Sequence, residues 1–134
     1  MRKTDVFVDA SAIVAVIARE PGHERLAARM KAASSRTTSP LAVFEAALAL
    51  ARKADEKVSL MRSRLDTMLA SLDIAVVEIP ASLGKEAVTA FERYGKGRHP
   101  ARLNMGDCFA YAMARHLDVP LLYEGDDFAR TDMA

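Results

Sequence analysis

Cysteine and long apolar runs are the two features that this sequence of 134 residues most clearly lacks. Cys108 is its single cysteine, which excludes an internal disulfide framework and a multi-cysteine zinc site and is typical of a reducing compartment. No apolar run approaches the roughly 18 residues that cross a bilayer, and the N-terminus lacks the apolar stretch of an export signal. These absences predict a cytoplasmic protein that is not bound to a membrane.

A strong charge of either sign is also missing. The 19 Lys and Arg residues nearly balance the 18 Asp and Glu residues, for a formal net charge of +1. The total therefore indicates neither a strongly basic nucleic-acid binder nor an acidic disordered tail. With 51% hydrophobic and 28% charged residues, and no repeat, low-complexity tract or linker, the composition predicts a single domain over residues 1–134.

Apolar patterns of two periods alternate along the chain. Short β-prone runs predict strands over residues 6–8, 36–39, 74–79 and 120–123. Between them, helical spacing of apolar residues predicts helices over 10–19, 22–33, 41–54, 60–72, 80–94 and 104–117, with a short helix or coil after 127. This order predicts an α/β fold, with a mostly parallel central sheet of four or five strands flanked by helices. In such sheets, ligands gather beyond the carboxyl ends of the strands.

Carboxylates stand in apolar or small-residue surroundings at four places. Asp9 directly follows the first predicted strand, and Glu45 is the only charge between positions 40 and 51. Asp107 follows a glycine in the first turn of a predicted helix, and Asp126 and Asp127 form a turn after the last strand. Converging carboxylates without cations bind hard divalent ions, and they suit Mg²⁺ or Mn²⁺ better than zinc.

Each of these acids also has a simpler explanation. Asp9 is equally suited to be a helix N-cap, Asp107 to be a first-turn acid that the helix dipole favours, and the Asp126–Asp127 pair to be turn residues. Glu45 on an apolar helix needs either a distant basic partner or a metal. The pattern favours a shared site because all four places fall at one edge of one predicted sheet.

Four segments resemble the signature segments of PIN-domain proteins, and most closely those of VapC-type toxins of toxin–antitoxin pairs. They are Phe-Val-Asp-Ala-Ser-Ala at 7–12, Ser-Pro-Leu-Ala-Val-Phe-Glu at 39–45, Asn-Met-Gly-Asp-Cys-Phe-Ala-Tyr-Ala at 104–112 and Leu-Leu-Tyr-Glu-Gly-Asp-Asp-Phe at 121–128. The resemblance implies a PIN-like fold and a Mg²⁺- or Mn²⁺-dependent endoribonuclease acting on RNA such as transfer or ribosomal RNA. It also implies a homodimer and a cognate antitoxin that inhibits it.

The resemblance assigns roles residue by residue. The implied catalytic and metal-binding acids are Asp9, Glu45, Asp107 and Asp126, with Asp127 as a further metal ligand and as the alternative to Asp126. Ser11 and Asn104 match positions that support the metal or its water. A metal-activated water needs no nucleophilic side chain, which agrees with the scattered histidines and the lack of a serine nucleophile motif.

A basic loop precedes the helix of Asp107. Residues 93–102 hold four basic residues and no acid. A solvated loop is the simpler explanation, but its place predicts that Lys96, Arg98 and Arg102 hold the RNA backbone, with Tyr94 available for stacking.

A catalytically inactive PIN-like module that binds RNA or a protein partner is the alternative function. The intact acids at all four places argue against it.

Overall fold

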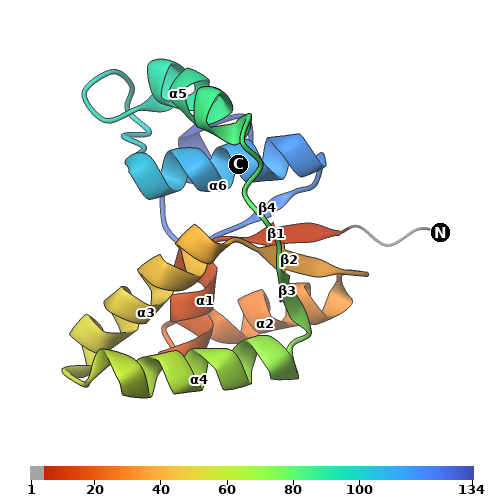
Figure 1. Cartoon of the computed structure of the whole chain (residues 1–134), viewed down its shortest axis with the longest axis vertical. Coiled ribbons are helices and arrows are strands. Elements are labelled where there is room, and N and C mark those ends of the chain that lie inside the picture. Colours follow the sequence, from red (N-terminus) through yellow and green to blue (C-terminus); the bar gives the residue numbers. More distant parts are fainter. Residues whose placement is uncertain (1–4) are drawn as a thin grey trace.

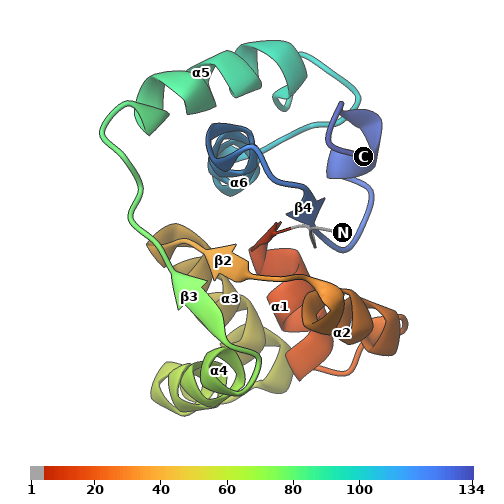
Figure 2. The same ribbon diagram turned by 90° about the vertical axis from the view of Figure 1, so that its right-hand side faces the viewer.

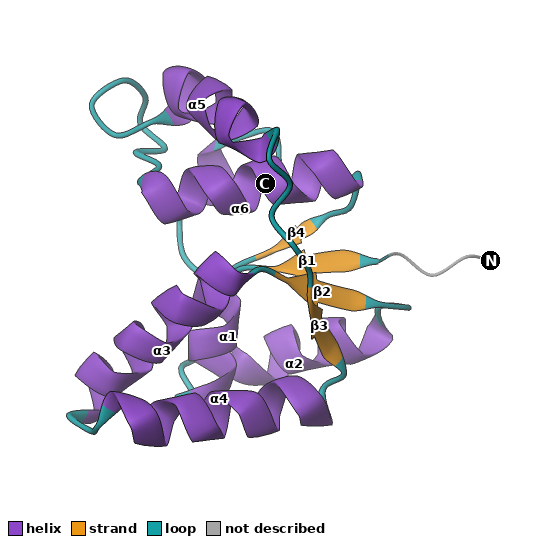
Figure 3. Cartoon of the chain, viewed as in Figure 1, coloured by secondary structure: helices purple, strands orange, loops and turns teal. Residues whose placement is uncertain are grey.

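The computed structural model describes residues 5–134, so the extreme N-terminus, on which the predicted lack of an export signal partly rests, lies outside it. Its centre is a four-stranded parallel sheet in the order β3-β2-β1-β4 (Figure 3). The strands are β1 (Val6–Val8), β2 (Arg36–Thr38), β3 (Ile74–Val76) and β4 (Leu121–Leu122). The predicted α/β class, with its parallel sheet, is confirmed.

Helices cover both faces of the sheet (Figures 1 and 2). One face carries α1 (Ala10–Ile17), α2 (His23–Ala32), α3 (Pro40–Ala54) and α4 (Val58–Ser71). The other carries α5 (Leu83–Tyr94), α6 (Met105–Leu117) and the short 3₁₀ helix η1 (Phe128–Arg130). Within residues 5–134, none of these helices has the length and apolar character needed to cross a bilayer.

The two strands after α4 and α6 are shorter than predicted. β3 ends at Val76 instead of reaching 79, and β4 has two residues instead of four. Pro120 has no N–H to donate to a ladder, which explains why β4 begins only at Leu121. Pro120 still takes part as an acceptor, since its carbonyl receives a hydrogen bond from the N–H of Phe7 at 3.0 Å.

Side-chain alternation along β1 divides the core in two. Val6 and Val8 pack toward α1–α4, whereas Phe7 packs toward α5 and α6 with Leu121. Both cores hold the central strand in place, so the residue that follows it, Asp9, has a fixed position at the carboxyl edge of the sheet.

Candidate active site

Asp9 is held rigidly where β1 meets α1. It is 4% exposed and caps α1, because its Oδ2 accepts hydrogen bonds from the Ser11 N–H at 3.0 Å and the Ser11 hydroxyl at 2.6 Å. Burial raises the pKa of Asp9; the bonds from Ser11 and Ala10 partly oppose this, and the charge of Asp127 adds to it. Asp9 is therefore the helix cap that the simpler explanation predicted, and its predicted site role stays a prediction.

Glu45 reaches the same edge from α3. The helix starts there because the Ser39 hydroxyl accepts the Ala42 N–H and Pro40 occupies the first turn. Burial raises the pKa of Glu45 to about 7, with further contributions from the charges of Asp9 and Asp107. No basic side chain is among the causes of this shift, although Arg52 and Lys53 line the same hollow as Glu45.

Gly106, in the first turn of α6, makes room for Glu45. A Cβ atom built on Gly106 would overlap the carboxylate of Glu45. The glycine therefore allows the backbone of α6 to approach the side chain of α3 closely, which no other residue would allow without displacement.

Asp107 is fixed by a capping box at the start of α6. The Asn104 side chain accepts the Asp107 N–H at 2.9 Å, and Asp107 Oδ2 accepts the Asn104 N–H at 3.1 Å. Burial raises the pKa of Asp107 to about 6; the bond from Asn104 opposes this, and Asp9 and Asp127 add to it. Asn104, predicted to support a metal or its water, thus orients the carboxylate itself.

The two acids after β4 differ in their surroundings. Asp127 is among the charges that raise the pKa of both Asp9 and Asp107, whereas Asp126 is among neither set. Both are exposed, and both line a cavity of about 460 Å³ together with Asp107. The charge contributions therefore favour Asp127, the alternative residue in the sequence interpretation, over Asp126 as the fourth acid.

Two hollows meet at Asp107. The acidic hollow, of about 350 Å³, contains Asp9, Ser11, Glu45 and Asp107. The basic hollow is the cavity of about 460 Å³ on the other side of Asp107. It holds Lys96, Arg102 and Asn104 with Asp126, Asp127 and Arg130.

The structure separates the residues of the basic loop. Lys96 and Arg102 line the basic hollow, but Arg98 does not. Tyr94 is not available for stacking on RNA, because it is 7% exposed and packs edge-on against His99 and Tyr111.

Sequence reasoning missed lining residues of both hollows. Arg130 lines the basic hollow from η1. It lies only three positions after Asp127, and this closeness in sequence could have identified it. The acidic hollow is also lined by Glu20, Arg52, Lys53 and Glu124, and Lys53 pairs with Glu20 at 2.8 Å. Their contribution depends on tertiary packing that no local pattern reveals.

The carboxylates suit a divalent cation by their chemistry. Within residues 5–134, no three His, Cys, Asp or Glu side chains are gathered into a ready cluster for a metal. Asp9, Glu45 and Asp107 nevertheless offer only oxygen donors, and burial together with repulsion from neighbouring acids raises the pKa of each. A hard cation would offset that repulsion, so the residues fit Mg²⁺ or Mn²⁺.

We expect Glu45→Gln to stabilise the metal-free protein at pH 8 by about 1–2 kcal/mol, after allowing for solvent screening. The folded state keeps a proton on Glu45 up to about pH 7, whereas the unfolded chain releases it near the ordinary value of 4.5. The free energy of unfolding of the wild type therefore falls as pH rises through this window, and at pH 4 the two proteins differ much less. Thermal unfolding in EDTA at both pH values measures this. Exposed Glu56→Gln is the matched control, and a gain for Glu45→Gln that is equal at both pH values would contradict the account.

Comparisons with known proteins agree with the geometry. The model of the family described as PIN domain matches residues 6–133. A VapC ribonuclease of Rhizobium meliloti is 42% identical over 139 residues, covering 95% of this chain and 98% of the relative. Ribonuclease VapC30 of Mycobacterium tuberculosis is 38% identical over 129 residues, with 96% of each chain covered.

Solved structures share the fold at low identity. VapC20 of Mycobacterium tuberculosis, described as a toxin that cleaves the sarcin–ricin loop, superposes with a TM-score of 0.72 at 19% identity, covering 92% of each chain. A toxin–antitoxin complex from Klebsiella pneumoniae gives a TM-score of 0.68 at 15% identity, covering 96% of this chain and 93% of that one. The family model over nearly the whole chain and the relatives at 38–42% identity show that the chain belongs to the PIN-domain family and, within it, to the VapC ribonucleases.

Proposed function

We propose that this chain hydrolyses RNA phosphodiester bonds with a Mg²⁺ or Mn²⁺ ion held by Asp9, Glu45, Asp107 and Asp127. One observation carries the proposal. The carboxylates of Asp9, Glu45 and Asp107 line one hollow at the carboxyl edge of a parallel sheet, and no cation is among the causes that shift their pKa values. A site with this excess of negative charge needs a cation before it can approach a phosphate.

The chain's own residues would orient the donors. Ser11 fixes Asp9 through Oδ2, and Asn104 fixes Asp107 through Oδ2, so neither carboxylate rotates freely. Gly106 leaves the room that the carboxylate of Glu45 occupies beside α6. When bound, the cation would lower the pKa of a water and offset the charge on the scissile phosphate. The reaction then requires no nucleophilic side chain.

We expect Asp127→Asn to slow RNA cleavage about 10–100-fold and Asp126→Asn to slow it less than about threefold. The reason is that Asp127, but not Asp126, acts electrostatically on Asp9 and Asp107. The two variants lose the same charge from adjacent positions, so each controls for the other. Initial cleavage rates of a labelled RNA compare them, and a larger loss for Asp126→Asn would return the fourth role to that residue.

The basic hollow supports RNA binding beside the acids. Lys96, Arg102 and Arg130 line it and are exposed, so phosphates on either side of the scissile bond would meet cations there. Arg98 lies outside this lining, and we propose for it only a peripheral role on the RNA backbone.

We expect the double variant Lys96→Ala/Arg102→Ala to weaken RNA binding and to reduce the slope of log affinity against log salt by about 1.4, or about 0.7 for each lost phosphate contact. Arg98→Ala should change the slope by less. Fluorescence titrations of a single-stranded RNA between low and moderate salt measure both, in the Asp9→Asn background to prevent cleavage. An unchanged slope in the double variant would exclude these contacts.

A second copy of this chain and a cognate antitoxin are the proposed protein partners. Large apolar side chains are exposed on α3, α5 and α6, where a partner surface would cover them. They are Phe44 (59% exposed) and Leu48 on α3, Val88 and Phe91 on α5, and Met105 (67% exposed) on α6. Transfer or ribosomal RNA remains the proposed substrate class, which would place the reaction in the cytoplasm.

Sequencing of RNA ends after brief expression tests the proposed function. New ends at defined sites with the wild type, but not with Asp9→Asn, would support a ribonuclease and identify its target. The same RNA ends with both proteins, together with tight RNA binding by the wild type, would favour the inactive binding module instead.

A further inference from the structure

The outer edge of β4 has no paired strand in the described part of the chain, and along it Leu121 is 3% exposed while Tyr123 is partly exposed. The Phe7 N–H donates to the Pro120 carbonyl at 3.0 Å and the Asp9 N–H to the Leu122 carbonyl at 2.9 Å, so these two carbonyls face β1. Backbone groups of successive strand residues point to opposite sides, and those of Leu121 and Tyr123 therefore face outward. Within the described part of the chain, β1 is the only strand paired with β4.

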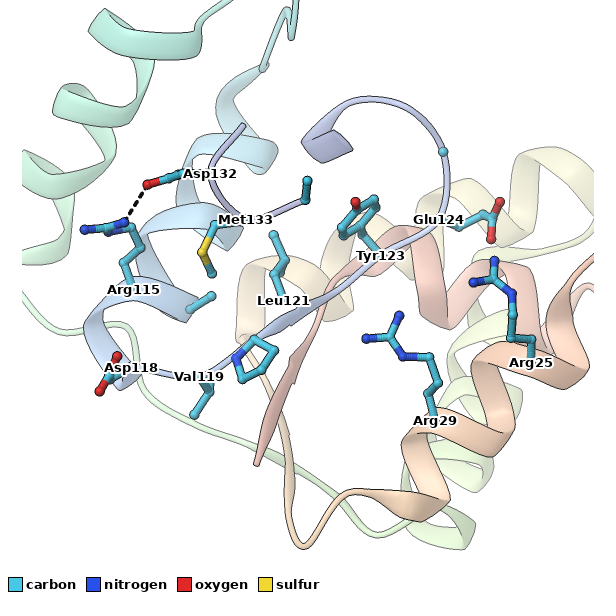
Figure 4. A pocket seen from close by; sticks show the side chains of 14 residues that line it. Arg25, Arg29, Arg115, Asp118, Val119, Leu121, Tyr123, Glu124, Asp132 and Met133 are labelled. Carbon is cyan, nitrogen blue, oxygen red and sulfur yellow. Dashed lines mark hydrogen bonds and ion pairs between the residues drawn. The ribbon is translucent and has the colours of Figure 1, made fainter. Parts of the chain in front are cut away.

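A hollow of about 650 Å³ follows this edge (Figure 4). Arg25 and Arg29 extend from α2 toward the strand that carries Leu121 and Tyr123, and they lie one helical turn apart. Both are exposed, and neither forms an ion pair or hydrogen bond with any residue from 5 to 134. Across the hollow, Arg115 already has a partner, because its guanidinium donates to Asp132 at 2.7 Å.

We propose that the β4 edge is a docking site for an extended, acidic segment of a protein partner, which would add to the sheet as a fifth strand. The segment's main chain would pair with the outward N–H and C=O groups of Leu121 and Tyr123. Carboxylates on alternate residues, which share one face of a strand, would meet Arg25 and Arg29. Apolar side chains would pack on Val119 and Met133, which line the same hollow.

RNA fits this hollow less well than an acidic peptide. Asp118, Glu124 and Asp132 also line it, and a continuous row of phosphates would meet all three. A peptide places its carboxylates only where the arginines lie, and it supplies the N–H donors that open carbonyls require.

A segment bound at this edge would influence the acidic hollow through one short chain of hydrogen bonds. Beyond Tyr123, the N–H of Glu124 donates to the Ser11 hydroxyl at 3.0 Å, and that hydroxyl donates to Asp9. The same segment continues to Asp127. The inference concerns a different surface from the proposed ribonuclease site and does not depend on cleavage.

A fluorescein-labelled hexapeptide of alternating valine and glutamate is the probe. Saturable binding to the wild type, weakened at least about tenfold in Arg25→Glu/Arg29→Glu, is the expected result. The control Arg62→Glu/Arg64→Glu reverses two exposed charges on α4 and should bind as the wild type does. Hydrogen exchange measured by NMR should slow at the amides of Leu121 and Tyr123 when the peptide is added, in Asp9→Asn as well as in the wild type.

Other results would overturn the inference. They are no saturable binding up to about 1 mM peptide, equal affinity for the same peptide with lysine in place of glutamate, or unchanged exchange at both amides. Protection of these amides by a single-stranded RNA without peptide would assign the edge to RNA. Protection that rises with protein concentration alone would assign it to a second copy of this chain.

Discussion

Asp9→Asn is expected to reduce RNA cleavage on the order of 10³-fold while leaving the protein folded. The buried carboxylate is central to the proposed cation site, and its loss removes a negative oxygen donor that asparagine does not replace. The asparagine carbonyl still accepts the hydrogen bonds from Ser11, and burial already disfavours the charge of Asp9. Cleavage of a labelled RNA, Mn²⁺ binding by calorimetry and thermal unfolding in EDTA together measure the effect.

Exposed Asp66→Asn on α4 is the matched control for this loss of charge. It should leave cleavage, Mn²⁺ affinity and thermal stability near the wild-type values. Undiminished cleavage by purified Asp9→Asn would contradict the assignment of Asp9. If the thermal stability of Asp9→Asn falls together with its activity, the loss of cleavage would instead be due to unfolding.

Gly106→Ala is expected to reduce cleavage about 100-fold, because the added methyl group would displace the carboxylate of Glu45 from the site. The obstacle is the far end of a flexible side chain and alanine favours the helix, so the expected loss of stability is no more than about 1 kcal/mol. Combining Gly106→Ala with Glu45→Asp, whose carboxylate is one methylene shorter, should restore part of the activity. Kinetics of the two single variants and the double variant measure this coupling.

Gly84→Ala controls for a methyl group added to a helical glycine. Gly84 lies in α5 with no atom within 4 Å of a Cβ at that position. We expect it to raise stability by about 0.5–1 kcal/mol and to leave cleavage unchanged. Normal cleavage by Gly106→Ala would show that the contact between α6 and Glu45 has no role in the reaction.

The sequence predicted the sheet, the six long helices and the common edge on which Asp9, Glu45 and Asp107 lie. Local signals were sufficient for these features. A β-prone run ending in an acid positions Asp9, and a lone charge on an apolar helix marks Glu45. Asn104 forms a capping box with Asp107, and its predicted support of a metal or its water stays a prediction.

Features that depend on packing between distant segments were not predictable in this way. The direction of the turn after β4, which favours Asp127 over Asp126, is set by how η1 packs, since Phe128 is 1% exposed. Tyr94 is buried because α5 packs closely on α6. The polar sequence of the following loop gives no sign of this packing. The open edge of β4 has no sequence signal, because strand order exists only in the assembled sheet.

The dependence of RNA cleavage on divalent cations shows whether the carboxylates at the sheet edge act through a metal ion. Purified wild-type protein and a labelled RNA are incubated with a series of Mg²⁺ or Mn²⁺ concentrations, with EDTA, and with Asp9→Asn in parallel. The account predicts cleavage that rises to saturation with the cation, stops in EDTA and is nearly absent in Asp9→Asn at every concentration. Cleavage that persists in EDTA, or that Asp9→Asn retains, would contradict it.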